Sequence, residues 1–184
     1  MEQKLKLELI KKLLRKKGEE GFSLIELVVV VAVLAVLSAI AIPSFQNASE
    51  KAKQKEASSL IASYLKAAQA YYTENSLTPN RTNHIGQYIT VTGCRQGNPQ
   101  YCRTNNSSLI NHSAASRNQW YSPNGHYDIR LQVSGTRVNF MAYPISASGL
   151  GVVGCYDSLS GATKLKENSG NEKGRGYVRN INCR

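Results

Sequence analysis

The hydrophobic pattern of the chain begins with one long apolar run. Between Phe22 and Ile42 the chain has 21 residues, of which only Ser23, Glu26 and Ser38 are polar. At about 1.5 Å rise per residue, these residues would form a helix of about 30 Å, which is the thickness of the hydrocarbon core of a bilayer. The pattern therefore predicts a helix that can span a membrane.

Glu26 is the unusual residue of this run. A charged side chain at the centre of a transmembrane helix costs about 2.5 to 3.5 kcal/mol on insertion scales, and less near the end, where Glu26 lies. The carboxylate therefore argues for a functional helix and against a simple signal anchor, although periodicity alone leaves the anchor open. A secretory signal is disfavoured, because its apolar region has only about 7 to 15 residues before a cleavage site of small residues, whereas Pro43 and Phe45 follow this longer run.

The apolar run is followed by a second helical pattern. From Ala48 to Tyr72, apolar residues recur at spacings of three and four, while Lys and Glu fill other positions, which predicts an amphipathic helix over 44–74. Pro43 lacks a backbone donor and its ring clashes with the preceding turn, so we expect a kink between the two helical halves. The polar and turn-forming residues that begin at Asn75 are expected to end the helix.

The rest of the chain, 75–184, is predicted to be a globular head. Its first part, 75–125, is a polar loop region, and 126–184 holds the sheet and the C-terminal disulfide region. Alternating apolar residues over 127–133 and 138–142 predict an antiparallel hairpin with a turn at Ser134 and Gly135, and further strands are expected at 150–156 and near 177–181. The predicted fold is therefore α+β, with a long N-terminal helix packed on a small antiparallel β-sheet.

Four cysteines follow the apolar helix, at Cys94, Cys102, Cys155 and Cys183. Their even number beyond a membrane helix indicates disulfides in an oxidising compartment. Of the three pairings that four cysteines allow, we favour Cys94 with Cys102, which closes a short loop, and Cys155 with Cys183, which tethers a Gly-rich tail. No pair has zinc-finger spacing and the three histidines are far apart in sequence, so we expect no metal and no cofactor.

Basic residues gather at both ends of the chain. Seven Lys or Arg against four Glu lie in residues 1–21, which indicates that this end of the helix faces the cytoplasm. The remaining residues hold 16 basic and eight acidic side chains, and six of the basic ones lie in the last 21 residues: Lys164, Lys166, Lys173, Arg175, Arg179 and Arg184. This tail is a candidate site for DNA or an anionic surface polymer. A solvated basic face is the favoured alternative, because no DNA-binding fold is visible.

Residues Gly21 to Pro43 resemble the processing site and N-terminal helix of type IV pilins, the class that includes type II secretion pseudopilins and competence pilins. The resemblance rests on Gly21, Phe22, Glu26 and Pro43 at fixed offsets around the apolar run. It implies that a prepilin peptidase removes 1–21 as a cytoplasmic leader, cutting between Gly21 and Phe22, and methylates the new terminus at Phe22. It also implies that 22–43 is the transmembrane and assembly helix.

A physical role for Glu26 follows from such processing. The new terminus at Phe22 carries an ammonium group, and its burial in a bundle of helices is costly unless a carboxylate offsets the charge. Glu26 of a neighbouring subunit is expected to supply that carboxylate and so to set where a subunit docks.

The sequence therefore predicts a structural subunit of a type IV pilus. We expect a protein that resides in the bacterial inner membrane, passes through the inner-membrane assembly machinery and polymerises into an extracellular filament for adhesion, motility or DNA uptake. The alternatives are a minor pilin or type II secretion pseudopilin, and a DNA- or surface-binding module displayed on a pilus. No nucleophile elbow, phosphate-binding glycine loop or HExxH motif is present, so an enzyme is not expected.

Overall fold

The computed structural model describes residues 22–95, 99, 102 and 109–183. Gly21 and Arg184 lie outside the described residues. The chain divides into two compact units, Met1–Phe45 and Gln46–Arg184, and each is described by itself.

Helix α2 (Leu24–Asn75) contributes to both units and contains Pro43. Within the described residues it is the one helix long and apolar enough to cross a membrane. Because Pro43 has no backbone N–H, the carbonyl of Ala39 lacks its usual helical partner. The kink at this position stays a prediction.

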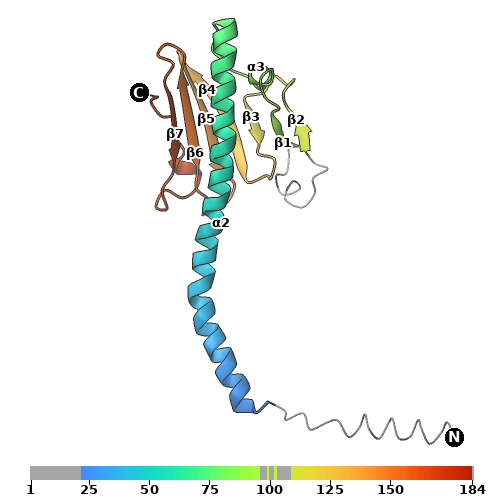
Figure 1. Ribbon diagram of the computed structural model, residues 1–184, viewed down its shortest axis with the longest axis vertical. Coiled ribbons are helices and arrows are strands. Elements are labelled where there is room, and N and C mark those ends of the chain that lie inside the picture. Colours follow the sequence, from blue (N-terminus) through green and yellow to red (C-terminus); the bar gives the residue numbers. More distant parts are fainter. Residues whose placement is uncertain (1–21, 96–98, 100–101, 103–108, 184) are drawn as a thin grey trace, which may run out of the picture. The chain divides into compact units, whose positions relative to one another are not determined.

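The second unit holds a seven-stranded sheet in the order β2-β1-β3-β4-β5-β6-β7, in which every neighbouring pair is antiparallel. Figure 1 shows the part of α2 in this unit lying across the sheet. The elements after α2 are α3 (Thr82–Ile85), β1 (Thr92–Cys94), β2 (Leu109–Asn111), β3 (Gln119–Tyr121), β4 (Tyr127–Ser134), β5 (Arg137–Pro144), β6 (Val152–Asp157), β7 (Thr163–Glu167) and the 3₁₀ helix η2 (Arg175–Tyr177). The predicted α+β class is confirmed.

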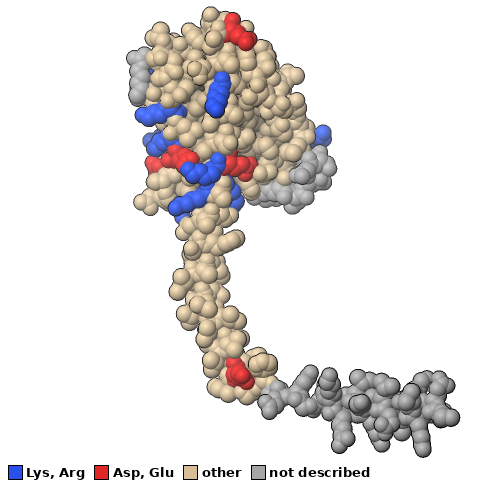
Figure 2. Space-filling view, viewed as in Figure 1, with Lys and Arg blue, Asp and Glu red and all other residues tan. Residues whose placement is uncertain are grey.

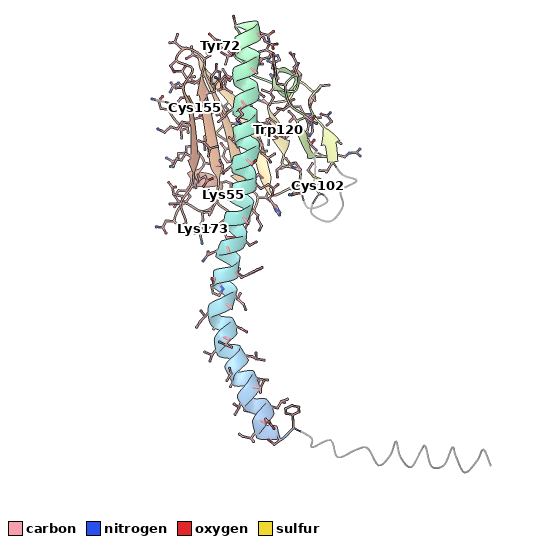
Figure 3. All side chains as sticks on the ribbon, viewed as in Figure 1. Lys55, Tyr72, Cys102, Trp120, Cys155 and Lys173 are labelled. Carbon is pink, nitrogen blue, oxygen red and sulfur yellow. A yellow bond between two sulfur atoms is a disulfide. The ribbon has the colours of Figure 1, made fainter. Side chains whose placement is uncertain are left out.

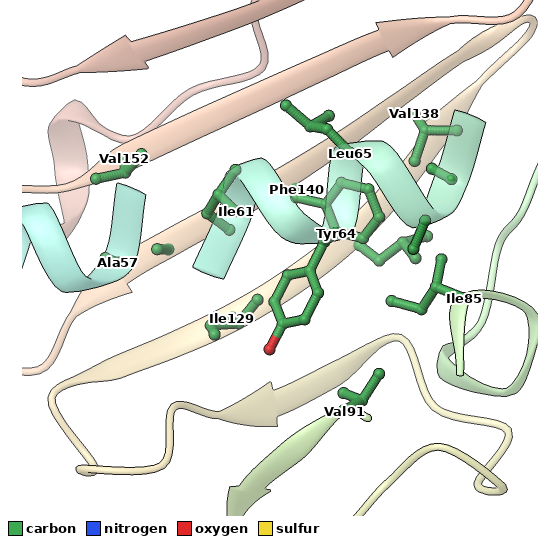
Figure 4. Close-up of a cluster of buried hydrophobic side chains, with 14 of the residues drawn as sticks. Ala57, Ile61, Tyr64, Leu65, Ile85, Val91, Ile129, Val138, Phe140 and Val152 are labelled. Atoms are coloured by element: carbon green, nitrogen blue, oxygen red, sulfur yellow. The ribbon is translucent and has the colours of Figure 1, made fainter. Parts of the chain in front are cut away.

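The main core lies between α2 and the sheet (Figure 4). Ile61 and Tyr64 of α2 are buried with Ile129 of β4 and Phe140 of β5. The Tyr64 ring meets Trp120 of β3 edge to face, with ring centroids 5.4 Å apart. The apolar positions of the amphipathic helix, which repeat every 3.6 residues, therefore pack on the inward positions of the strands, which repeat every two residues.

A smaller cluster covers the opposite face of the sheet. Met141 and Val153 alternate with residues that face α2, and they pack with Val178, Tyr143 and Ile181. Because the C-terminal segment supplies Val178 and Ile181, strands β5 and β6 are buried on both faces. We call the face that carries Met141 and Val153 the outer face.

Two details of the strand prediction are wrong. The hairpin turn consists of Gly135 and Thr136, because Ser134 still pairs with Arg137, and Gly135 takes the positive φ of +59° that a tight turn requires. Residues 177–181 form no strand, and the last strand is β7, where Leu165 is the single apolar residue.

Region 75–125, predicted as a polar loop, also supplies α3 and the strands β1, β2 and β3. Each of these strands has only three residues. Such strands are too short to show an alternating pattern. They form by pairing in series, because β3 pairs with the longer strand β4, β1 pairs with β3, and β2 pairs with β1.

Candidate assembly helix and basic surface

The first unit presents an apolar helix surface that its own chain does not cover. All described residues from Phe22 to Phe45 are exposed, including Leu24 at 81% and Phe45 at 76%. Soluble proteins rarely expose so large a continuous apolar surface, which marks a membrane or protein contact. The segment can therefore lie in a bilayer or in a bundle of other helices.

Ser23 caps the start of α2. Its Oγ accepts a hydrogen bond from the Glu26 backbone N–H at 3.3 Å, and its carbonyl accepts one from Leu27 N–H at 3.2 Å. Ser23 and Glu26 have the spacing of a capping box, a sequence signal for a helix start that is separate from the apolar pattern. In the described part of the chain, the Glu26 carboxylate has no hydrogen-bond or ion-pair partner.

The other predicted assembly residues lie on the same exposed segment. Phe22, which comes just before the helix, is 79% exposed, and Pro43 lies inside α2. The structure brings no other described part of the first unit against Phe22, Glu26 or Pro43.

Two disulfides join strands of the second unit to cysteines outside the sheet. Cys94 at the end of β1 is bonded to Cys102, with Cα atoms 5.8 Å apart, and Cys155 of β6 is bonded to Cys183, with Cα atoms 5.3 Å apart. These are the pairs favoured from the sequence, and in Figure 3 Cys102 and Cys155 lie on either side of α2. Among the described residues no cluster of three or more His, Cys, Asp or Glu could hold a metal ion.

The basic residues of the C-terminal tail do not form one uniform patch. Lys164 and Lys166 are exposed on β7, and Lys173, Arg175 and Arg179 are exposed on the segment that follows. Lys166 Nζ lies 3.3 Å from Glu172 Oε1 in an ion pair. Figure 2 shows Lys and Arg close to Asp and Glu on the visible face of the head.

Arg175 is engaged in a structural ion pair. Its Nη2 lies 2.6 Å from Oδ2 of Asp128, a β4 residue that is only 2% exposed, and Arg130 Nη2 lies 3.0 Å from the same oxygen. Gln119 Nε2 donates to the other carboxylate oxygen at 3.0 Å, and both guanidinium groups lie over the Tyr143 ring, 5.0 and 5.3 Å from its centroid. Arg175 therefore holds the C-terminal segment against the sheet.

A second ion pair joins α2 to β7. Lys55 Nζ lies 2.7 Å from Glu167 Oε2, and Ser58 Oγ donates to Glu167 Oε1. The hydrogen bonds from Lys55 and then Ser58 lower the pKa of the Glu167 carboxyl, so this carboxylate is ionised near neutral pH.

Comparison with known proteins finds a family motif at the start of helix α2 and one fimbrial relative. The family model for the prokaryotic N-terminal methylation motif matches residues 16–42. The chain is similar to the fimbrial protein EcpC of Eikenella corrodens, with 33% identity over 78 residues, which cover 42% of this chain and 51% of that protein. The chain thus spans about half the length of this curated relative. No solved structure matches the chain.

The methylation motif covers the apolar segment, in which Glu26 is the single charged residue from Phe22 to Pro43. The relative is a fimbrial protein, and the described fold is a long helix packed on an antiparallel sheet with two disulfides. The resemblance seen in the sequence is confirmed, and the chain has the motif, the relative and the fold consistent with a type IV pilin.

Proposed function

We propose that this chain is a structural subunit of a type IV pilus, processed by prepilin peptidase between Gly21 and Phe22 and methylated on Phe22. The subunit waits in the bacterial inner membrane, and the assembly machinery of that membrane moves it into an extracellular filament. The observation that carries the proposal is the exposed apolar segment over 22–45, in which the first turn of α2 carries one carboxylate and residues 22–42 match the methylation motif.

Burial of the helix in a filament explains its composition. The apolar side chains exposed between Phe22 and Phe45 would contact equivalent side chains of neighbouring subunits after they leave the lipid. Because lipid is as apolar as these side chains, the transfer itself gives little hydrophobic driving force, and packing and polar contacts must direct assembly. A charged pair in the helix bundle supplies such direction.

Glu26 is placed to make that pair. Its backbone N–H is satisfied by Ser23 Oγ, and within the described residues its carboxylate has no partner in its own chain. The ammonium group of a processed Phe22 in a neighbouring subunit would provide one. Removing the carboxylate would leave a buried ammonium unpaired, which costs several kcal/mol.

The experiment is mass spectrometry of filaments sheared from the cells of origin. We expect an abundant peptide that begins at N-methylated Phe22. In the Glu26→Ala variant we expect normal processing with loss of filaments, while Ser38→Ala, which changes a neutral polar residue of the same helix, should assemble normally. An uncut Met1 terminus, or normal assembly of the Glu26→Ala variant, would contradict the proposal.

The same experiment separates the class of pilin. A processed chain that occurs only in the membrane or in trace amounts in filaments would indicate a minor pilin or a type II secretion pseudopilin.

A role in adhesion, motility or DNA uptake depends on what the head displays. For DNA binding by the basic tail, the test residues are Lys164, Lys173 and Arg179, because charge reversal at Arg175 would also break its ion pair with Asp128.

A further inference from the structure

A cavity opens on the outer face of the sheet, between the strands β6 and β7 and the C-terminal segment. Its volume is about 390 Å³, which is within the range of small-ligand sites. Val153 of β6 and Ile181 of the C-terminal segment contribute apolar side chains, and Lys166 of β7 and Arg179 contribute cations. The site therefore combines an apolar surface with positive charge.

The cavity is lined by one more basic than acidic side chain. Lys166 is paired with Glu172 at 3.3 Å, and Glu172 also accepts a hydrogen bond from Ser169 N–H at 3.0 Å. These contacts, the Ser169 N–H first, lower the pKa of the Glu172 carboxyl. Among the described residues Arg179 has no acidic partner, so the two cations and one carboxylate leave a net charge of +1. A guanidinium group binds a carboxylate through two parallel hydrogen bonds.

The remaining walls suit a ligand with hydroxyl groups and one apolar face. Tyr177, on η2, lines the cavity with a side chain that is 52% exposed. Asn168 also lines it, and although the residue is only 3% exposed, its Oδ1 has no hydrogen-bond partner within the described part of the chain. The Asn180 amide is held in the wall, because its Nδ2 donates to Gln132 Oε1 at 3.2 Å. Amide and phenol groups both exchange hydrogen bonds with hydroxyls.

The wall formed by the C-terminal segment is fastened at both ends. Arg175 is paired with the buried Asp128, and Cys183 is bonded to Cys155 of β6. Between them, Val178 packs on Met141 and Val153. The side chains of Tyr177 and Arg179 are therefore carried on a backbone that is already ordered, which reduces the entropy that a ligand must offset on binding.

We propose that this cavity binds a sugar residue that carries a carboxylate, such as a uronate unit of a surface polysaccharide. Its carboxylate pairs with Arg179, its hydroxyl groups meet Asn168 and Asn180, and the apolar face of its ring lies against Tyr177. Nucleic acid fits less well, because a strand carries one charge per nucleotide and needs a row of available cations, whereas Lys166 and Arg175 are already paired with carboxylates.

The test is isothermal titration calorimetry of the full chain in a detergent without sugar groups. The probes are trigalacturonate, the uncharged galactose trisaccharide and a short double-stranded DNA. We expect trigalacturonate to bind at least about tenfold more tightly than the neutral trisaccharide, because a charge-assisted, bidentate contact contributes on that scale. Since the chain is not polymerised, the result does not depend on whether it forms a pilus.

Variants decide whether the cavity is responsible. Arg179→Gln should lower affinity for trigalacturonate about tenfold, to the level of the neutral sugar, and Tyr177→Ala should weaken both sugars. Lys164→Gln makes the same charge change on β7 outside the cavity and should have no effect; Trp120 fluorescence checks the fold of each variant. Absence of trigalacturonate binding, equal losses in Arg179→Gln and Lys164→Gln, or tighter binding of DNA than of trigalacturonate would each overturn the proposal.

Discussion

Gly154 lies on β6 where α2 packs against the sheet, and replacing it with alanine tests that packing. An alanine Cβ would lie 2.4 Å from Cγ2 of Ile61 and 2.9 Å from Cδ1 of Leu65. Carbon atoms in favourable contact are about 3.5 to 4.0 Å apart, so the new methyl group would be about 1 Å too close to Ile61. Both side chains are buried, and moving Cγ2 of Ile61 by rotation about χ1 is disfavoured, because a β-branched side chain in a helix has one strongly preferred rotamer.

The expected cost follows from two opposing effects. Overpacking a core by one methyl group typically costs about 1 to 3 kcal/mol, whereas alanine restricts the unfolded chain and returns about 0.4 to 1 kcal/mol. We expect Gly154→Ala to lower the free energy of unfolding by about 1 to 2 kcal/mol. Ile61→Ala should cost about 2 to 5 kcal/mol through the cavity it leaves. In the double variant the new methyl group enters that cavity, so the combined cost should be at least about 1 kcal/mol less than the sum.

Urea unfolding of the full chain in detergent, without reductant, measures these free energies. Trp120 is the single tryptophan of the chain and is 2% exposed in the core, so its fluorescence reports the packing of the head. Gly170→Ala is the matched control, because no atom lies within 4 Å of its added Cβ. If Gly154→Ala behaves like Gly170→Ala, or if its cost is unchanged in the Ile61→Ala background, the close packing inferred between α2 and β6 is refuted.

Three further predictions concern the head. Arg175→Gln should lower the free energy of unfolding in urea by only about 1 to 2 kcal/mol, because Asp128 keeps its ion pair with Arg130. No loss of stability would refute the structural role of Arg175. Replacing both Cys155 and Cys183 by serine should cost about 3 to 4 kcal/mol, from the chain entropy of a 28-residue separation; a loss below 1 kcal/mol would contradict this. Burial, and then the charge of Arg117, lower the pKa of the His112 imidazole. The stability that neutral His112 contributes is therefore complete above the unfolded pKa of about 6.5. It is lost as pH falls from that value through the lower pKa of the folded state. The leucine variant of His112 should lose less stability between pH 7 and pH 5, and an unchanged pH dependence would contradict this.

Local patterns in the sequence were sufficient for the longest elements. The apolar run and the amphipathic period predicted one helix that ends near Asn75, because these patterns repeat over many turns. The hairpin of β4 and β5 was predicted because two alternating runs flank a short turn that contains Gly135, although the turn was placed one residue too early. Each of these elements is specified by residues that are close together in the chain.

Short and edge elements were not predictable in the same way. Strands β1, β2 and β3 have three residues each, so they depend on pairing partners for their existence. Strand β7 is at an edge of the sheet, and its alternating pattern has Leu165 as the only apolar residue. Exposed edge strands often carry lysines, which discourage pairing with other chains. A strand of this composition cannot be recognised from alternating hydrophobic residues.

Sequence by itself determined the membrane-length helix, the carboxylate at Glu26 and the motif for N-terminal methylation, because all three are properties of a contiguous segment. Only the tertiary structure decided which basic residues of the tail are available. Arg175 is paired with Asp128, 47 positions away, whereas Arg179 lines a cavity that β6, β7 and the C-terminal segment form together. The physical reason is that a count of charges contains no distances, and a carboxylate neutralises only the cation that the fold brings within a few ångströms of it.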